Sequence, residues 1–594
     1  MKTFQLLLLR ARQEIRRDGS LWLTLLLAST LLLLPNAAVV FIPSFSWPSL
    51  RLWLFSLSLL LMLGTMGLRV RTLLWLSSPL LILVPACVVC VLSIQNLPTT
   101  FLMLALLETN QAELTTFKAQ ALYTAVGTLA LAALYLWLVK ARVSASSRLG
   151  PVARVFLLAC LVLPSAYDFF KYGAAVSVAS FKQRCLSTFP CSTFYAGYEA
   201  LALRARVQER KNLVKTTSVQ QDLAFKHDPQ RQVHMLVIGE SATRSCFSLY
   251  GYERPTTPLL ERTAGLLPFR DVTAAATVTL VAVPSMITSA PPGKVLEATR
   301  QASLLTAYRK AGFRVYWLSS QRKHGTFDTL NSLFSEDADE SVFKGGKFDT
   351  YGSGAYDSAS DTSLLPLVTS ILNRKEPKVL FVLHTIGSHG PYPARYSDRL
   401  TRFPADRQAI MDAMLRIYSG VAQSPHDLQL VQDSYDNTIF ATDFLLANLI
   451  HLLRGTQASS WFCYVSDHGE NTSKALLNKF MHGIVSRQVV EIPMLMWLSP
   501  DYTQRHPQKA ATLRANLDTP FSATSIYHTL LDMGGLACAD FKAEQSAAAM
   551  QFSPGPRLVC DSRGKITDYD RAFPPLKSAL PTAKHAQALP ISRP

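Results

Sequence analysis

Long apolar runs fill the first third of this chain of 594 residues. The five runs are approximately Leu21–Ile42, Leu52–Leu68, Leu73–Ile94, Ala119–Val139 and Val152–Phe169. Each is near the length that a helix needs to cross about 30 Å of hydrocarbon. The pattern predicts a transmembrane domain of five helices over residues 1–170, followed by a soluble part.

The basic residues indicate how such a bundle is oriented. They form three clusters, which are Arg10, Arg12, Arg16 and Arg17; Arg69 and Arg71; and Lys140, Arg142, Arg148 and Arg154. All three lie on one side of the membrane if the N-terminus is cytoplasmic, as the positive-inside rule favours. The soluble part is then outside the cytoplasm. The N-terminal segment is not expected to be a cleavable signal peptide, because several apolar runs follow it without a small-residue cleavage site.

The formal net charge of +18 is high for a chain of this size. A nucleic-acid partner is disfavoured because no nucleic-acid-binding module is visible in the sequence. Basic loops beside the spans and a basic face against anionic headgroups explain the charge better. Residues 171–230 form a connector, in which FYAGYEALALRARVQERKNLV is expected to be an amphipathic helix. Its basic side either rests on headgroups or is simply solvated.

The nine cysteines do not have the spacing of a thiolate zinc site, since CxxC pairs and Cys/His clusters are too few. Two pairs flank short loops, Cys185 with Cys191 and Cys538 with Cys560. Each pair could form a disulfide if the soluble part is exported. Cys246 and Cys463 are then expected to be lone thiols of the core.

Short β-branched runs alternate with helical stretches after about Val233, which is typical of a parallel α/β sheet. The predicted core strands are Val233–Gly239, Phe313–Leu318, Val379–His384 and Trp461–Ser466. The predicted helices include Leu304–Ala311, Ser360–Leu372, Ser434–Arg454 and Ala523–Met533. The soluble domain is placed at residues 231–566. Residues 567–594 are rich in proline, alanine and charge, and are expected to be disordered.

Carboxylates and imidazoles follow three of the predicted strands. Glu240 ends the first, His389 lies shortly after the third, and Asp467 with His468 and Glu470 ends the fourth. Ligands of parallel α/β sheets bind beyond the carboxyl ends of the strands, so these groups are expected at one edge. Mixed oxygen and nitrogen ligands suit zinc, and oxygen-rich sets suit manganese. Taken singly, each residue is also compatible with an ordinary helix cap or turn.

Five blocks of sequence resemble the phosphoethanolamine transferase family, and they occur in the family's order. They are GESATRSCFSLYGYERPTTPLL, VTAAATVTLVAVPSM, HTIGSHGPY, SYDNTIFATDFLL and VSDHGENT. The resemblance covers most of the chain except the C-terminal tail. It implies a five-helix membrane part and an alkaline-phosphatase-like (sulfatase-type) α/β/α domain with a mainly parallel sheet. It also implies a bacterial inner-membrane protein with its catalytic domain in the periplasm.

The resemblance assigns the metal site and the nucleophile. Glu240, Asp467 and His468 match the ligands of a catalytic Zn²⁺, with Mn²⁺ as the less favoured metal. Thr279 matches the nucleophile, which is also a metal ligand and carries the phosphoethanolamine group in the intermediate. The residues alone leave Thr273 and Thr277 open as well.

The resemblance also assigns residues that handle the substrate. His389 and His482 match histidines that bind the phosphate and move protons. Glu470 is expected to hold the ethanolamine ammonium. Lys323 or His324 would take the place of a phosphate-binding stretch in lipid A-modifying members. Some members brace the nucleophile loop with a disulfide, but Ala275 and Ser285 occupy those positions, so the loop is expected to be held by packing alone.

The expected reaction is the transfer of phosphoethanolamine from phosphatidylethanolamine to lipopolysaccharide. The acceptor is a core sugar or lipid A, with the wording of SLYGY and the SSQ segment slightly favouring core sugar. Members that modify lipid A cause polymyxin resistance. The protein is expected to be a monomer that contacts membrane lipids.

Several other functions compete with this one. A lipoteichoic-acid-synthase-like phosphoglycerol transferase would share the spans, the threonine and the ligands, and other family members modify periplasmic glucans. A sulfatase in the narrow sense is disfavoured because its CxPxR nucleophile motif is absent. A non-catalytic scaffold would be expected to lack at least one ligand. A transporter is disfavoured because the spans carry few charges.

Overall fold

The structure is a computed structural model. It describes residues 21, 23–36, 68–88, 97, 103, 118–172, 181, 188–226, 228–321, 323, 333–345, 360–418, 424–472, 482–562 and 564–574. The chain divides into two compact units at Arg206 and Val207. The division of the chain into four segments at residues 170, 230 and 566 stays a prediction.

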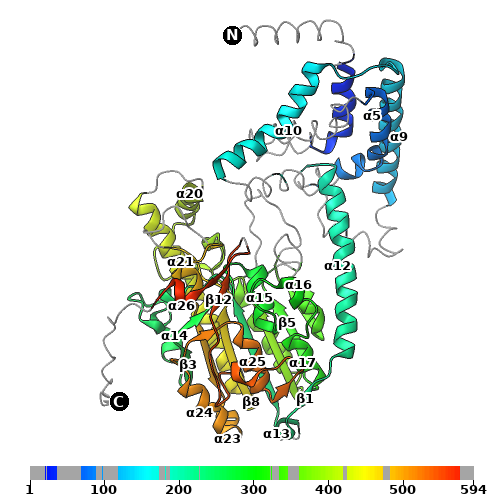
Figure 1. Ribbon diagram of the computed structural model, residues 1–594. Helices are drawn as coiled ribbons and strands as arrows, with labels where there is room; N and C mark the ends of the chain where they lie inside the picture. Colours follow the sequence, from blue (N-terminus) through cyan, green and yellow to red (C-terminus); the bar gives the residue numbers. More distant parts are fainter. Residues whose placement is uncertain are drawn as a thin grey trace. The chain divides into compact units, whose positions relative to one another are not determined.

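The first unit is helical (Figure 1). Its elements include α5 (Val70–Ser77), a 3-10 helix (Ser78–Ile82), α9 (Lys118–Arg142) and α10 (Pro151–Tyr172). Among the described residues, Thr124–Arg142 is the helix whose length and composition would let it cross a membrane. Shorter apolar helices cover Leu23–Leu32, Val70–Ile82 and Pro151–Tyr167.

The five-span bundle therefore stays a prediction as a whole. The fourth and fifth runs are helical, as predicted. The third run begins as α5 but continues as a 3-10 helix at Pro79, because proline has no N–H group for the α-helical ladder. Almost all of the second run, Leu52–Leu68, lies outside the described residues.

The predicted connector helix exists as α12 (Cys191–Thr216), but its basic residues do not all face outward. Arg210 is buried in the second unit. Its guanidinium group forms an ion pair with Asp337, donates a hydrogen bond to the carbonyl of Thr299 at 2.9 Å, and lies 4.2 Å above the ring of Phe334. The expectation that this side of the helix meets headgroups or water is wrong for Arg210, because burying a guanidinium requires this set of partners.

Replacing Arg210 with methionine should destabilise the second unit by about 3–5 kcal/mol, since it leaves the Asp337 carboxylate buried without its cation. Denaturant unfolding of the detergent-solubilised protein measures this change. The matched control is Arg270→Met, which breaks an exposed pair with Asp518. Such exposed pairs contribute about 1 kcal/mol or less. Equal effects of the two substitutions would contradict the anchoring role of Arg210.

The second unit is built on a seven-stranded sheet in the order β3-β9-β8-β2-β7-β5-β6. The strands are β2 (Gln232–Gly239), β3 (Leu266–Phe269), β5 (Arg314–Ser319), β6 (Glu340–Phe343), β7 (Lys378–His384), β8 (Ser459–Ser466) and β9 (Met494–Leu498). All neighbours pair in parallel except β9, which is antiparallel to both β8 and β3. The four predicted strands are confirmed and form the contiguous centre β8-β2-β7-β5.

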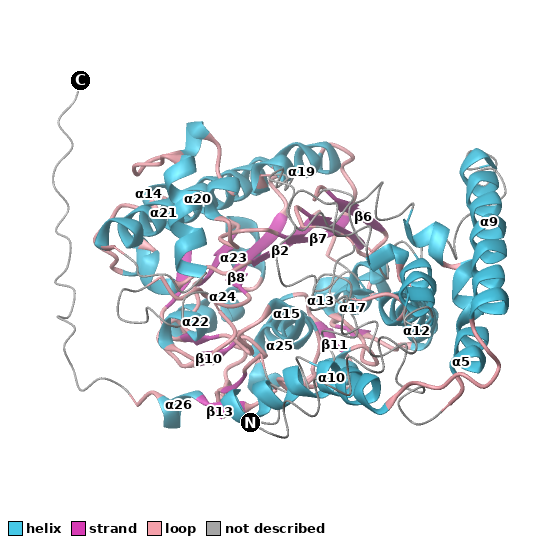
Figure 2. Cartoon of the chain, turned by 90° about the horizontal axis from the view of Figure 1, so that it is seen from above, coloured by secondary structure: helices cyan, strands magenta, loops and turns pink. Residues whose placement is uncertain are grey.

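Helices cover both faces of this sheet, as Figure 2 shows. One face packs on α14 (Pro258–Glu261), α19 (Leu364–Leu372), α20 (Arg407–Tyr418) and α21 (Pro425–Gly455). The other packs on α15 (Thr279–Ile287), α17 (Leu304–Lys310), α24 (Pro507–Ala515) and α25 (Ser525–Met533). Alternate residues of β2 enter the two cores, Val237 on one side and Leu236 with Ile238 on the other. The result is the predicted three-layer α/β/α arrangement with a mainly parallel sheet.

Small elements complete the second unit. The two-stranded pairs are β1 (Gln220–Gln221) with β11 (Leu536–Ala537), β4 (Val272–Thr273) with β10 (Phe521–Ser522), and β12 (Leu558–Cys560) with β13 (Ile566–Asp568). The short helices are α13 (Leu223–Lys226), α16 (Val295–Ala298), α22 (Arg487–Val490), α23 (Pro500–Arg505) and α26 (Tyr569–Ala572). Since β13 and α26 are ordered, the prediction of disorder from residue 567 is wrong for this stretch. Residues 575–594 lie outside the described part.

The cysteines of the second unit are thiols. Cys246 and Cys463 are buried, as expected. Cys538 and Cys560 are also free, so the disulfide considered for them is not formed. Cys560 packs beside Ala276 and Ala282, whereas Cys538 contacts a different core cluster. In the first unit Cys191 is free, and Cys185 lies outside the described residues.

Candidate active site

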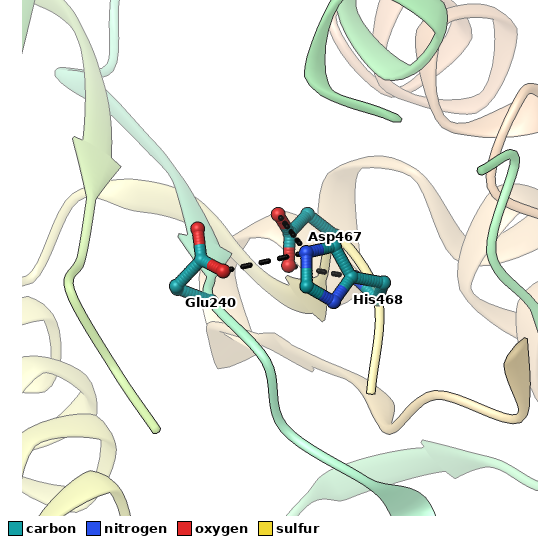
Figure 3. Close-up of side chains that lie close together, drawn as sticks. All are labelled: Glu240, Asp467 and His468. Atoms are coloured by element: carbon teal, nitrogen blue, oxygen red, sulfur yellow. Dashed lines mark hydrogen bonds and ion pairs between the residues drawn. The ribbon is translucent and has the colours of Figure 1, made fainter. Parts of the chain in front are cut away.

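Three potential metal ligands meet at the carboxyl edge of the sheet. Glu240 directly follows β2, and Asp467 with His468 directly follows β8. Since β2 and β8 are parallel neighbours, both strand ends lie at the same edge. One ligand atom from each of these buried residues lies within 4.8 Å of the others (Figure 3). The structure therefore brings together the three residues that the sequence singled out.

The hydrogen bonds around the cluster leave its ligand atoms available. His468 Nδ1 lies 3.0 Å from the carbonyl oxygen of Gly469, so this nitrogen donates and Nε2 keeps its lone pair. Nε2 lies 3.4 Å from both Glu240 Oε1 and Asp467 Oδ2. Asp467 Oδ2 is buried and accepts no hydrogen bond from the described residues. A buried oxygen without a donor is costly unless another group satisfies it.

The electrostatics of the cluster favour a cation. Burial alone would raise the pKa of Glu240, but His468, His389 and His482 outweigh it and lower that pKa to about 2. Burial and the neighbouring Glu240 charge raise the pKa of Asp467 well above its ordinary value. Burial, followed by the charge of His482, lowers the pKa of His468 to about 3, so the imidazole is neutral at pH 7. Two adjacent buried carboxylates need a compensating positive charge.

A divalent metal ion fits this donor set. Two carboxylates and a neutral imidazole supply oxygen and nitrogen donors, which zinc accepts at catalytic sites. The lack of a donor at Asp467 Oδ2 is what a ligand oxygen would show in a structure without metal ions. Metal binding would also favour the ionised form of Asp467, whose pKa is otherwise raised.

The sequence interpretation missed two residues that position these ligands. Ser241 donates its hydroxyl to Glu240 Oε1 at 2.8 Å and its backbone N–H to Asp467 Oδ1 at 3.1 Å. It is buried and has a φ of 57°, a left-handed conformation that is strained for serine. Gln321 Nε2 contacts Glu240 Oε2 at 3.3 Å and the Thr385 carbonyl at 2.7 Å. No spacing rule in the sequence would have identified either residue.

Thr279 brings a hydroxyl group to the same cluster. Its Oγ1 donates to Glu240 Oε2 at 2.9 Å and lies 3.2 Å from His468 Nε2. It is the first residue of α15, where the positive end of the helix favours a developing anion. Of the other two candidates, Thr273 Oγ1 contacts the carbonyl of Phe521 at 3.3 Å, and Thr277 Oγ1 is buried without a hydrogen bond to any described residue.

The loop before Thr279 is held by backbone hydrogen bonds as well as by packing. Cys560 of β12 donates its N–H to the Ala275 carbonyl at 3.0 Å and accepts the N–H of Thr277 at 3.0 Å. The expectation that this loop is held by packing alone is therefore wrong. A strand from the far C-terminal region pairs with it, which a comparison of disulfide positions could not reveal.

Two further histidines lie beside the cluster. The ring centroid of His482 lies 4.4 Å from that of His468 and 5.8 Å from that of His389. His482 Nδ1 lies 3.3 Å from Glu470 Oε2. Burial would lower the pKa of His482, but the Glu470 carboxylate outweighs it and raises that pKa. Glu470 Oε1 is buried and has no hydrogen-bond partner among the described residues.

The structure does not bring Lys323 into this group. Its ammonium lies 3.3 Å from Glu336 Oε1 and is partly exposed. His324 lies outside the described residues, so its predicted role is not tested. The contacts of Lys323 give no support to a phosphate-binding role.

Comparison with known proteins decides the family. Residues 232–536, just over half of the chain, match the sulfatase family. The chain belongs to this family. The match runs from β2 to β11 and includes Glu240, Thr279, Asp467 and His468. The family is one of enzymes. The narrow sulfatase motif CxPxR is absent from the sequence, and the hydroxyl beside the potential ligands is that of Thr279.

The curated relatives carry a more specific name. Phosphoethanolamine transferase EptC of Escherichia coli K12 is 26% identical over 345 residues, which cover 57% of this chain and 57% of the relative. Phosphoethanolamine transferase EptA of Salmonella typhimurium is 28% identical over 331 residues, covering 54% and 56%. The chain thus spans just over half the length of these relatives. The crystal structure of the C-terminal periplasmic domain of E. coli EptC with zinc superposes with a TM-score of 0.51 at 24% identity, covering 60% of this chain and 96% of that domain.

Proposed function

We propose that this protein transfers phosphoethanolamine from phosphatidylethanolamine to lipopolysaccharide through a phospho-threonine intermediate at Thr279. The observation that carries the proposal is the position of the Thr279 hydroxyl, 2.9 Å from Glu240 Oε2 and 3.2 Å from His468 Nε2. A hydroxyl inside a group of potential metal ligands can serve as an activated nucleophile. The names of the curated relatives supply the transferred group.

The proposed metal is zinc. Glu240, Asp467, His468 and Thr279 would hold it, and Ser241 with Gln321 would orient Glu240. When bound, the ion would lower the pKa of the threonine hydroxyl and offset charge on the phosphoryl oxygens. The related EptC domain crystallised with zinc supports this choice over manganese.

The first half-reaction is a displacement at phosphorus. Thr279 Oγ1 first loses its hydroxyl proton to solvent. A bond then forms between this oxygen and the phosphorus of phosphatidylethanolamine, and the bond from phosphorus to the glycerol oxygen breaks. Diacylglycerol leaves with a proton, which His482 or His389 is placed to donate. The raised pKa of His482 suits it to this role, because the ring then carries a proton at a higher pH than an ordinary histidine.

The second half-reaction reverses the roles. A histidine that has given up its proton takes one from an acceptor hydroxyl or phosphate, whose oxygen attacks the phosphorus. The bond from phosphorus to Thr279 Oγ1 breaks, and phosphoethanolamine passes to the acceptor. Glu470 Oε2 lies 3.3 Å from His482 Nδ1. Its other oxygen, Oε1, is buried and has no hydrogen-bond partner among the described residues, so it can accept a hydrogen bond from the ethanolamine ammonium.

The proposed location is the bacterial inner membrane, with the second unit in the periplasm. The donor is a membrane lipid, so the enzyme must work at a bilayer surface. The apolar helix Thr124–Arg142 and the other apolar runs support a multi-pass anchor. The related E. coli domain is described as periplasmic. The acceptor is proposed to be core sugar or lipid A, with core sugar ahead.

Mass spectrometry of cell envelopes tests the activity and identifies the acceptor. Lipid A, core oligosaccharide and periplasmic glucans are compared between cells that make the wild-type protein and cells that make Thr279→Ala. One lipopolysaccharide fraction should gain the mass of a phosphoethanolamine unit only with the wild-type protein. A gain of phosphoglycerol would support the lipoteichoic-acid-synthase-like alternative, and a gain on glucans would overturn the proposed acceptor.

A further inference from the structure

The residues that follow the sulfatase-family match form a separate small element. The match ends at residue 536, and residues 558–572 then form the hairpin of β12 and β13 followed by α26. β12 and β13 pair with each other over three residue pairs. We call β12, β13 and the turn between them the C-terminal hairpin. It belongs to the second unit.

The C-terminal hairpin contacts the segment that carries Thr279. Cys560 exchanges two backbone hydrogen bonds with this segment, one to the Ala275 carbonyl and one from the Thr277 N–H, each 3.0 Å long. Cys560 also packs beside Ala276 and Ala282. Two such bonds next to each other fix the direction of the chain just before the nucleophile.

The same hairpin contacts the segment that carries His482. The N–H of Ser562, at the turn of the hairpin, donates to the Gly483 carbonyl at 3.1 Å. The N–H of Gly483 donates in turn to the Thr277 carbonyl at 3.0 Å. The hairpin, the Thr279 segment and the His482 segment are thus joined in one backbone network. The network contains no side chain of the metal cluster.

Arg557 anchors this network to the rest of the unit. It is buried, forms ion pairs with Asp271 and Asp570, and its guanidinium lies 4.5 Å from the ring centroid of Tyr569. Asp271 precedes β4, whose continuation leads to Thr279. Tyr569 donates its hydroxyl to Glu491 Oε1 at 2.7 Å. Arg557 therefore ties both ends of the hairpin to the start of the nucleophile segment.

We propose that the C-terminal hairpin is a positioning element, which holds Thr279 and His482 in register for phosphoryl transfer. This inference rests on the proposed function. Transfer requires the nucleophile and the proton donor to be aligned on opposite sides of one phosphorus atom. Small errors in such alignment are costly, since a displacement of about 1 Å can reduce the rate about a hundredfold. Arg557 acts through the backbone network and is a positioning residue, not a catalytic one.

Arg557→Met tests the inference in the full-length, zinc-loaded enzyme. The rate at which phosphoethanolamine becomes attached to Thr279 is measured in a single turnover with a short-chain phosphatidylethanolamine. KM is measured in the steady state, and zinc content is measured separately. The rate should fall about tenfold to a hundredfold, while KM and zinc content stay unchanged. Arg557→Lys should restore part of the rate, because it keeps a cation near Asp271. Arg571→Met is the matched control, since it removes an exposed arginine from the same region.

A second variant tests the same inference if Arg557→Met fails to fold. Gly483 has a φ of +98°, and a Cβ there would lie 3.3 Å from Ser562 Oγ. A side chain at this φ is strained, and its Cβ would make a tight contact with Ser562, so Gly483→Ala should disturb the join between the hairpin and the His482 segment and lower the same rate. Wild-type rates in a folded Arg557 or Gly483 variant would overturn the inference. The proposed function would survive that result as long as Thr279→Ala remained inactive, so the two failures are distinguishable.

Discussion

Thr279→Ala is expected to abolish phosphoethanolamine transfer, with a loss of at least about a thousandfold. The substitution removes the atom to which phosphorus would become bonded, and mutation of a nucleophile in comparable enzymes costs factors of this size or more. Zinc content should fall less than in Asp467→Asn, because Thr279→Ala removes a hydroxyl and leaves both carboxylates and the imidazole in place. Activity is measured with labelled phosphatidylethanolamine, and mass spectrometry of the tryptic peptide should show the covalent adduct in the wild-type protein only.

Thr277→Val is the control for this experiment. Thr277 lies two residues before Thr279, and its buried hydroxyl has no hydrogen bond to a described residue. Replacing an unsatisfied buried hydroxyl with a methyl group of the same shape should leave stability unchanged or improved. Transfer by this variant should also remain. If Thr279→Ala keeps its activity while Thr277→Val loses it, the nucleophile has been misassigned.

Asp467→Asn is expected to strip the protein of zinc. Substitutions of residues that only orient a ligand weaken metal binding about 10–100-fold, so the loss of a ligand carboxylate should cost more. Elemental analysis of the dialysed protein should show close to one zinc per chain for the wild type and a small fraction of that for the variant. Glu240→Gln is expected to behave in the same way.

Thermal unfolding gives a second readout that does not depend on activity. Zinc should raise the unfolding temperature of the wild-type protein, because a ligand that binds the folded state stabilises it by mass action. The unfolding temperature of Asp467→Asn should not respond to zinc. Asp518→Asn is the matched control, since its carboxylate is exposed and pairs with Arg270. Normal zinc content in Asp467→Asn would contradict the metal site.

The core of the fold could be predicted because its strands are buried on both faces. β2, β5, β7 and β8 appear in the sequence as compact apolar runs, and in the structure they are neighbours. Parallel pairing then places Glu240, Asp467 and His468 at one edge, so this part of the site followed from strand order and polarity. The other three strands of the sheet, β3, β6 and β9, were not predicted. Their runs are short, and β9 is antiparallel, which the alternation of strands and helices does not signal.

Other features depended on contacts between distant residues. Thr279 could not be separated from Thr273 and Thr277 by residue type, and the distances to Glu240 and His468 now separate them. The burial of Arg210 against Asp337 overrode the amphipathic pattern of its helix. The pairing of Cys560 with the nucleophile segment joins residues nearly 300 positions apart, far beyond the range of local patterns.

Ser241 shows where folding and chemistry make opposite demands on one position. Its left-handed backbone would suit glycine better, yet glycine could not donate the hydroxyl hydrogen bond to Glu240. The carboxyl edge of β2 is therefore not the most stable arrangement available to this chain. Selection for higher thermal stability should favour substitutions that relieve the backbone strain at residue 241. The selected variants should bind metal less well. The need to hold Glu240 and Asp467 in place would then limit the thermal stability that the enzyme can reach.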